Sequence, residues 1–225
     1  MTLFEALQQR HSVRSYRDLP LQEESIRVLQ EEIQACNQKG VLHIQLITQE
    51  PKAFDGFMAH YGKFSGVQNY IALIGPKGED LEEKLGYYGE RLVLLAQTLG
   101  LNTCWVAMTV SKGTVKNRCE IQAGEKLVCV LALGYGATQG IAHKSKPMET
   151  LCRTEGPAPD WFFKGMEAAM LAPTAMNQQK FLISLGENNM VAIKSLGGFY
   201  SKVDLGIVKC HFEIGAGTQH FRWEN

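Results

Sequence analysis

The sequence lacks an excess of charge of either sign, and it lacks any long apolar run. Its 225 residues include 23 lysines and arginines and 23 aspartates and glutamates, which gives a formal net charge of zero. A neutral chain without a basic segment attracts nucleic acids and anionic membranes only weakly. No apolar stretch approaches the roughly 20 residues needed to span a bilayer, and no signal-peptide core opens the chain. We therefore expect a cytoplasmic protein without nucleic-acid or membrane partners.

The sequence also lacks the patterns of metal sites, disulfide frameworks and common catalytic motifs. Its six cysteines form no CxxC pair, and Cys129, for example, lies in an apolar run, where a thiol behaves as a small hydrophobic group. The six histidines show no ligand spacing, and HExxH, GxSxG and Walker sequences are missing. We expect reduced, structural cysteines, no metal and no protein nucleophile. An enzyme of this kind depends on a cofactor for its chemistry.

Hydrophobic periodicity and turn residues predict an α+β fold. Helices are expected over residues 2–9, 20–40, 79–99, 161–171 and 202–214, and strands over 41–48, 68–74, 127–133 and 181–185. Gly86 and Gly89 in the longest helix would let another helix approach closely, which suggests an interface. The polar, proline- and glycine-rich stretch 134–159 is expected to be a linker or an excursion from the fold. Helices come first and strands mixed with helices follow, which favours a mainly antiparallel sheet flanked by helices.

The first candidate for binding chemistry is the segment Arg10-x-Ser12-x-Arg14. On an extended backbone, residues at i, i+2 and i+4 point the same way, so two guanidinium groups and a hydroxyl would converge on one spot. The fork of an arginine suits phosphate or carboxylate. The alternative is a surface loop whose arginines pair with nearby carboxylates, and spacing alone favours that alternative.

A second candidate, Ala172–Gln179, packs amide and hydroxyl groups into the turn between a helix and a strand. Such a turn suits the polar edge of a heteroaromatic ring. Ordinary turn chemistry also explains it, because proline ends a helix and asparagine tolerates a left-handed backbone. On its own, the segment favours that simpler interpretation.

A third candidate is the glycine-rich segment Gly134–Gly140, which follows the buried strand 127–133. It nearly matches a dinucleotide-binding fingerprint, but its last glycine comes one residue late and no amphipathic helix begins there. Because that fingerprint requires the helix, we reject it. Lys144 and Lys146 follow, and they would either add positive charge for a phosphate or form a solvated loop.

Together, these segments resemble the nitroreductase family. The matching stretches read RHSVRSY, ERLVLLAQTLGLNTCW, LALGYGATQGIAHKSKP and APTAMNQQ. In most members the Ala-Pro block lies soon after Arg-x-Ser-x-Arg, whereas here it comes last. That order, with the closing segment VDLGIVKCHFEIGAG, resembles the putative-nitroreductase subfamily, in which two rearranged halves build the fold. The resemblance implies two pseudo-related halves, residues 1–150 and 151–225, that form a single compact unit.

The resemblance also implies a bound FMN and the residues that contact it. Arg10, His11, Ser12 and Arg14 would hold the phosphate and the ribityl chain or pyrimidine edge. Thr103, Cys104, Trp105 and Val106 would approach the isoalloxazine ring. Lys144 and Lys146 would complete the phosphate site, and Pro173, Thr174 and Asn177 would border the flavin from the other half. The Gln-Pro-Trp that usually follows in this block is altered here, where Gln179-Lys180 stands after Asn177-Gln178.

The implied activity is electron transfer from NAD(P)H through FMN to a nitroaromatic, a quinone or a similar small-molecule acceptor. Reductive dehalogenation and simple flavin reduction are alternatives within the same chemistry. A different alternative is a degenerate nitroreductase-fold protein that binds flavin or a partner without turnover. Family members share each flavin site between two subunits, so a homodimer is expected, although part of that pairing could be internal to this chain.

Overall fold

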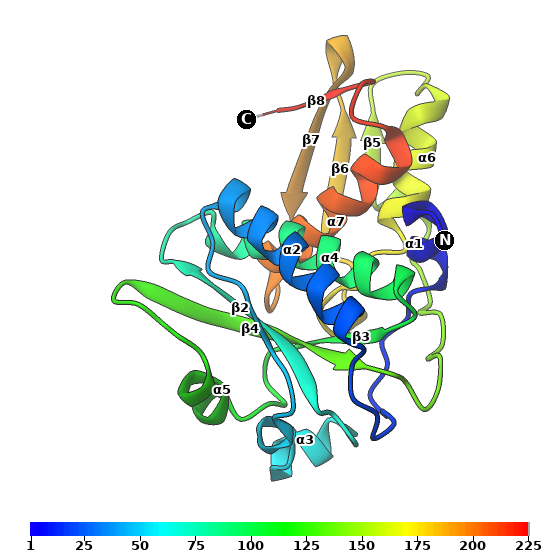
Figure 1. Ribbon diagram of the computed structural model, residues 1–225. Helices are drawn as coiled ribbons and strands as arrows, with labels where there is room; N and C mark the ends of the chain where they lie inside the picture. The colour runs from blue at the N-terminus through cyan, green and yellow to red at the C-terminus, as the bar shows by residue number, and fades with distance from the viewer. Residues whose placement is uncertain (225) are drawn as a thin grey trace. The chain divides into compact units, whose positions relative to one another are not determined.

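The computed structural model describes residues 1–224, which divide into two compact units (Figure 1). The first unit contains residues 9–81 and 92–142. The second contains residues 2–8 and 82–91 and the described chain from His143 onward. The division into halves at residue 150 stays a prediction.

The first unit is built on a four-stranded antiparallel sheet with the strand order β1-β2-β4-β3. Its strands are β1 (Gln45–Ile47), β2 (Asn69–Pro76), β3 (Asn102–Val106) and β4 (Glu125–Gly134). The apolar run 127–133 is buried throughout its length, as expected for a central strand covered on both faces. The two edges of this sheet are therefore the short strands β1 and β3.

Helix α2 (Glu23–Gly40) is the longest helix within the first unit, and its buried stripe includes Leu29, Ile33 and Cys36. The predicted end of this helix at Gly40 is confirmed, and the residue that follows, Val41, adopts a left-handed backbone with φ of 53°. The side-chain amide of Asn37 then binds both backbone groups of Ile44, at 2.7 and 2.9 Å. This turn delays the strand expected from residue 41. The shorter helices of the unit are η1 (Pro51–Phe54), α3 (Phe57–Tyr61) and α5 (Lys112–Arg118).

The second unit contains a mixed four-stranded sheet with the order β5-β6-β7-β8. Its strands are β5 (Cys152–Thr154), β6 (Phe181–Leu185), β7 (Met190–Ser195) and β8 (Arg222–Trp223). The central pair β6–β7 is antiparallel and the two outer pairs are parallel. The prediction of a linker over 134–159 is therefore wrong in part. The short strand β5 forms there because it pairs with a segment some thirty residues further along the chain.

Close helix packing characterises the rest of the second unit. Its helices include α1 (Leu3–Gln9), α6 (Asp160–Ala169) and α7 (Ser201–Ala216), and α4 (Leu81–Thr98) contributes its residues 82–91. A Cβ added at Gly86 would collide with the backbone carbonyl of Val203, and one at Gly206 with that of Glu83. The close approach predicted for Gly86 is thus confirmed, and the partner is α7 of the same chain.

The predicted α+β class is confirmed, with one antiparallel sheet, one mixed sheet and helices around them. The remaining 3-10 turns are η2 (Met148–Thr150), η3 (Ala175–Asn177) and η4 (Glu187–Asn189). Over residues 1–224, no helix combines the length and apolar character needed to cross a membrane. The same residues contain no group of three or more potential metal ligands.

Candidate flavin site

The Arg10–Tyr16 segment lies on the free edge of β3. The backbone N–H of Val13 donates to the carbonyl oxygen of Thr103 at 3.0 Å, and Ser12 and Thr103 form an isolated parallel bridge. Further along, the N–H of Ser65 donates to the Arg14 carbonyl, and the N–H of Tyr16 donates to the Ser65 carbonyl, both at 3.0 Å. The segment is therefore extended, as predicted, and fixed by backbone hydrogen bonds from two sides.

The side chains of Arg10, Ser12 and Arg14 all act on one atom, the buried thiol of Cys104 in β3. Burial raises the pKa of this thiol. The Arg14 guanidinium, a hydrogen bond with Ser12 and the Arg10 guanidinium all act in the opposite direction. All three side chains are therefore near enough to Cys104 to act on its thiol.

The two arginines differ in exposure and in their surroundings. Arg10 is only 4% exposed, whereas the Arg14 side chain is exposed to solvent. Among residues 1–224, no carboxylate forms an ion pair with Arg14. The alternative interpretation of this segment requires such a carboxylate. The guanidinium of Arg14 is consequently available to an anionic ligand.

The side chains of the four β3 residues predicted to approach a flavin ring point to opposite faces of the sheet. Cys104 and Val106 belong to the hydrophobic core of the first unit, so their side chains serve packing. Thr103 and Trp105 alternate with them and face the other side of the sheet. Thr103 is buried, whereas Trp105 is half-buried.

The glycine-rich segment after β4 packs against the Arg10–Tyr16 segment. The side-chain oxygen of Asn102 accepts a hydrogen bond from the N–H of Gly136 at 2.9 Å, which holds the segment to the start of β3. Gly140 has φ of 72°, and a Cβ there would lie 2.9 Å from the Cβ of His11 and 3.0 Å from the Ser12 carbonyl oxygen. No helix begins at these glycines, which agrees with our rejection of a dinucleotide fingerprint. Spacing alone did not identify Asn102 or Gly140 as contributors.

In the second unit, the predicted residues gather around the segment Thr174–Gln179, here named the strap. The side-chain N–H of Asn177 donates to the carbonyl oxygen of Lys144 at 3.0 Å. The ammonium of Lys146 donates to the carbonyls of Gln178 and Gln179 at 2.8 and 3.1 Å. The structure thus brings Asn177 and both lysines together. Pro173 and Thr174, both half-buried, immediately precede these contacts.

Gln179, which we did not predict as a site residue, is at the centre of this network. It is 3% exposed, and its side-chain N–H groups donate to the carbonyl of Lys144 and to the side-chain oxygen of Asn177, both at 2.9 Å. Its side-chain oxygen accepts from the backbone N–H of Lys146 at 2.8 Å. The sequence signal was available, because this glutamine is one of three consecutive amide residues in the block.

The backbone of the strap is strained. Met176, Asn177 and Gln179 have φ of 52°, 53° and 44°, in the left-handed region. A residue other than glycine is uncommon there, and such strain clusters at functional sites. The Met176 side chain is 81% exposed, so burial of that side chain does not compensate for the strain. The hydrogen bonds around Gln179 help to hold this conformation.

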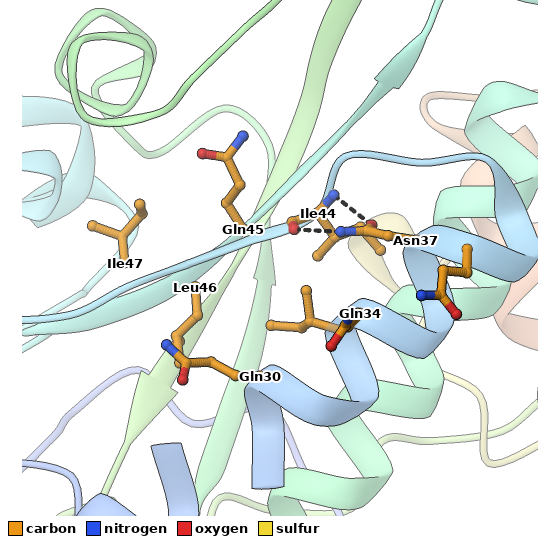
Figure 2. A pocket seen from close by; sticks show the side chains of 9 residues that line it. Gln30, Gln34, Asn37, Ile44, Gln45, Leu46 and Ile47 are labelled. Carbon is orange, nitrogen blue, oxygen red and sulfur yellow. Dashed lines mark hydrogen bonds between the residues drawn. The ribbon is translucent and has the colours of Figure 1, made fainter. Parts of the chain in front are cut away.

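An open groove with a volume of about 560 Å³ lies between α2 and β1 of the first unit. Figure 2 shows amide side chains along it, including Gln30, Gln34 and Gln45. Its lining includes none of the residues predicted to bind FMN. The groove is therefore a separate surface feature.

The fold and the Arg10–Tyr16 segment at the edge of β3 define a nitroreductase-like α+β protein. The model of the family described as "Putative TM nitroreductase" matches residues 2–216. The chain therefore belongs to this nitroreductase family, as the sequence resemblance indicated. No curated protein matches the chain.

Solved structures give the same assignment of the fold. A protein from Thermotoga maritima, described as a "putative nitroreductase", is 24% identical and has a TM-score of 0.66, over 96% of this chain and 83% of that one. One from Desulfovibrio desulfuricans, in complex with FMN, is 18% identical with a TM-score of 0.53, over 71% and 99%. One from Bacteroides thetaiotaomicron, described as a "Putative NADH dehydrogenase/NAD(P)H nitroreductase", is 17% identical with a TM-score of 0.53, over 66% and 95%.

Proposed function

We propose that this protein is an FMN-dependent oxidoreductase that transfers electrons from NAD(P)H to nitroaromatic, quinone or similar small-molecule acceptors. The observation that carries the proposal is the convergence of Arg10, Ser12 and Arg14 at Cys104, with the Arg14 guanidinium unpaired by any carboxylate of residues 1–224. Membership of the nitroreductase family and the FMN complex of the Desulfovibrio protein support the choice of cofactor.

The residues of the first unit fit the phosphate end of FMN. A phosphate monoester carries nearly two negative charges and three acceptor oxygens near neutral pH, and two guanidinium groups with a hydroxyl provide complementary donors. His11 lies between Arg10 and Ser12, with Gly140 packed against it. In our proposal, Arg10, His11, Ser12 and Arg14 hold the phosphate and the ribityl chain or pyrimidine edge, while Thr103 to Val106 lie near the ring.

The second unit contributes the other proposed contacts, which are Pro173, Thr174, Asn177, Lys144 and Lys146. The ammonium of Lys146 already donates to two strap carbonyls, so one of its three hydrogens remains for a phosphate oxygen. In our proposal, the ammonium of Lys144 is the more available of the two positive charges. The side chain of Lys144 is exposed, and this residue contacts the strap through its backbone carbonyl oxygen.

When bound, FMN would supply the electron-transfer chemistry, so the protein needs no nucleophile of its own. The chain would contribute binding, orientation and positive charge. The printed name of the Bacteroides protein, which includes NAD(P)H, supports a nicotinamide donor. A homodimer that shares the flavin also belongs to the proposal, and light scattering with and without FMN tests it.

The first test is the cofactor itself. Protein purified and reconstituted with excess FMN is expected to show a flavin absorbance band that NADH or NADPH bleaches under argon. Protein that stays colourless after reconstitution contradicts the proposal and favours an interaction protein. Protein that binds flavin but transfers no electrons to any acceptor points to a flavin carrier instead. Product analysis across nitroaromatic, quinone and halogenated acceptors separates the possible reactions.

The second test is the role of Arg14. Arg14→Ala removes one charge-assisted interaction of about 1.5–3 kcal/mol, so we expect the Kd for FMN to rise roughly 10- to 100-fold. Arg17→Ala is the matched control, because Arg17 is also an exposed arginine and directly follows the Arg10–Tyr16 segment. Riboflavin serves as a second ligand, and unchanged riboflavin affinity in Arg14→Ala would assign Arg14 to the phosphate. Equal FMN affinity in wild type and both variants would rule out this role for Arg14.

A further inference from the structure

Asp204 is a buried carboxylate whose two oxygens both bind the strap. It belongs to the first turn of α7 and is 5% exposed. Its Oδ1 accepts a hydrogen bond from the backbone N–H of Ala175 at 2.9 Å, and its Oδ2 accepts one from the side-chain N–H of Gln178 at 2.7 Å. Gln178 also donates to the carbonyl of Phe199 at 2.8 Å. These contacts join the strap to the start of α7.

The contacts of Asp204 lie on both sides of the strained residues. Ala175 precedes Met176 and Asn177, which have left-handed backbones, and Gln178 follows them. A left-handed conformation at a residue other than glycine persists only where the surroundings fix it. An ionised carboxylate that accepts two charge-assisted hydrogen bonds is a strong constraint of this kind.

We propose that Asp204 is a positioning residue that fixes the strap in the conformation needed to border the flavin. The part of this inference that concerns the flavin rests on the proposed function. The part that concerns the constraint on the strap rests only on the geometry of the second unit. Asp204 itself touches no reacting atom in this proposal. Its role is to orient Asn177 and Thr174 through the backbone on either side of Met176.

Protonation of Asp204 would weaken this constraint. Burial raises its pKa to about 6, and the hydrogen bonds from Gln178 and Ala175 act in the opposite direction. Tyr200 and Lys202 are titratable residues close to Asp204 in sequence at the start of α7, and the ammonium of Lys146 binds the strap carbonyls. A protonated carboxyl keeps one good acceptor oxygen and becomes a donor at the other, so one of the two contacts is lost below pH 6.

The first experiment measures the strap without any cofactor. Hydrogen exchange by mass spectrometry compares peptides covering residues 174–179 in wild type and Asp204→Asn at pH 7, with β6 peptides as an internal reference. We expect at least a tenfold faster exchange of the strap in the variant. Asp160→Asn is the control, because Asp160 is an exposed aspartate at the start of another helix of the same unit. Unchanged strap exchange in Asp204→Asn overturns the proposal.

The second experiment connects the strap to the flavin. FMN is titrated into wild type and Asp204→Asn between pH 5 and pH 8, and the ratio of the two Kd values is followed. The FMN phosphate titrates near pH 6 in both proteins, so it cancels in this ratio. We expect the variant to bind about tenfold more weakly at pH 8 and the ratio to approach one at pH 5. A ratio independent of pH overturns the positioning role.

A third variant keeps the proposal testable if Asp204→Asn does not fold. Gln178→Ala removes one of the two hydrogen bonds and leaves the carboxylate, so we expect an intermediate rate of strap exchange. Wild type that binds no FMN would contradict the proposed function, while faster strap exchange in Asp204→Asn would still support the constraint. Faster exchange with unchanged FMN affinity would separate the strap from the flavin and overturn the inference.

Discussion

At the scale of single residues, the same Asp204 is expected to lower the stability of the native protein. The folded chain binds the Asp204 proton more tightly than the unfolded chain, because burial raises the pKa from 3.8 to about 6. The free energy of unfolding therefore falls by about 3 kcal/mol in total as the pH rises from about 4 to about 6. Above that range it is constant. We expect Asp204→Asn to equal wild type near pH 4 and to be more stable by up to about 3 kcal/mol at pH 7.

Urea unfolding of both proteins at pH 4.5, 6 and 7.5 measures this difference. A purely structural aspartate would give the opposite result, with a less stable Asn variant at neutral pH. A variant that is more stable yet binds FMN more weakly would show a trade-off between stability and function.

A second buried carboxylate contrasts with Asp204. Glu90 and His211 are both fully buried, and the Glu90 Oε1 lies 2.8 Å from the Nε2 of His211. The other ring nitrogen, Nδ1, lies 3.0 Å from the carbonyl oxygen of Ala168. Removing one partner of such a pair leaves a buried polar group unsatisfied and costs about 3–5 kcal/mol. We expect Glu90→Leu to lower the free energy of unfolding by this amount, measured by urea titration.

The double variant Glu90→Leu/His211→Leu tests the cause of that loss. If the unsatisfied imidazole dominates the cost, the double variant recovers part of the stability lost in Glu90→Leu. A double variant less stable than the single one would instead assign the cost to lost packing.

Sequence patterns predicted some site residues well and others poorly, for a physical reason. Arg10, Ser12 and Arg14 were predictable because their spacing matches an extended backbone, and β3 supplies that conformation. Asp204 and Gln179 were missed because their roles depend on partners about 30 residues away in sequence. No local pattern records such a partner.

At the scale of elements, the glycines of α4 and α7 set how closely these helices pack. Gly86→Ala adds a methyl group where the carbonyl of Val203 lies, and overpacking of this kind costs about 1–3 kcal/mol. Gly113→Ala is the matched control, because nothing lies within 4 Å of a Cβ added to this α5 residue. In that helix, replacing glycine with alanine raises the free energy of unfolding by up to about 1 kcal/mol. Thermal unfolding should therefore shift in opposite directions for the two variants, and a shared direction would contradict the close packing.

The same distinction between local and distant signals explains which elements were predictable. The helices α4, α6 and α7 begin and end within about two residues of their predicted bounds, because a buried stripe repeats along each one. The strands β3, β5, β7 and β8 were missed. Two of them are only two or three residues long, and their partners come from other parts of the chain.

Helices α4 and α7 also end alike, which supports the proposal of two pseudo-related halves. Each is followed by a glycine with positive φ, Gly100 at 75° and Gly217 at 76°. Each then leads into a strand that contains a tryptophan, Trp105 in β3 and Trp223 in β8. The recurrence of helix, left-handed glycine and tryptophan strand is consistent with a repeated element.

At the scale of the whole molecule, binding of FMN is expected to stabilise the native chain. A ligand that binds only the native state stabilises it by RT ln(1 + [L]/Kd), which is about 2.7 kcal/mol at one hundred times the Kd. For a chain of 225 residues, this corresponds to a rise in Tm of roughly 5–10 °C. Arg14→Ala should show a smaller rise at the same FMN concentration, while Arg17→Ala should match wild type.

Hydrogen exchange with and without saturating FMN shows where that stabilisation acts. If both groups of residues contact the cofactor, protection increases in peptides covering 10–16 and 103–106 of the first unit, and also in peptides covering 144–146 and 174–179 of the second. Protection confined to the first unit would assign the phosphate contacts to Arg10–Arg14 alone. The contribution of Asn177 and the strap would then be wrong, because a segment that borders the cofactor loses its opening motions when the cofactor binds. Protection confined to the second unit would instead contradict the phosphate role of Arg14, on which the proposed function depends.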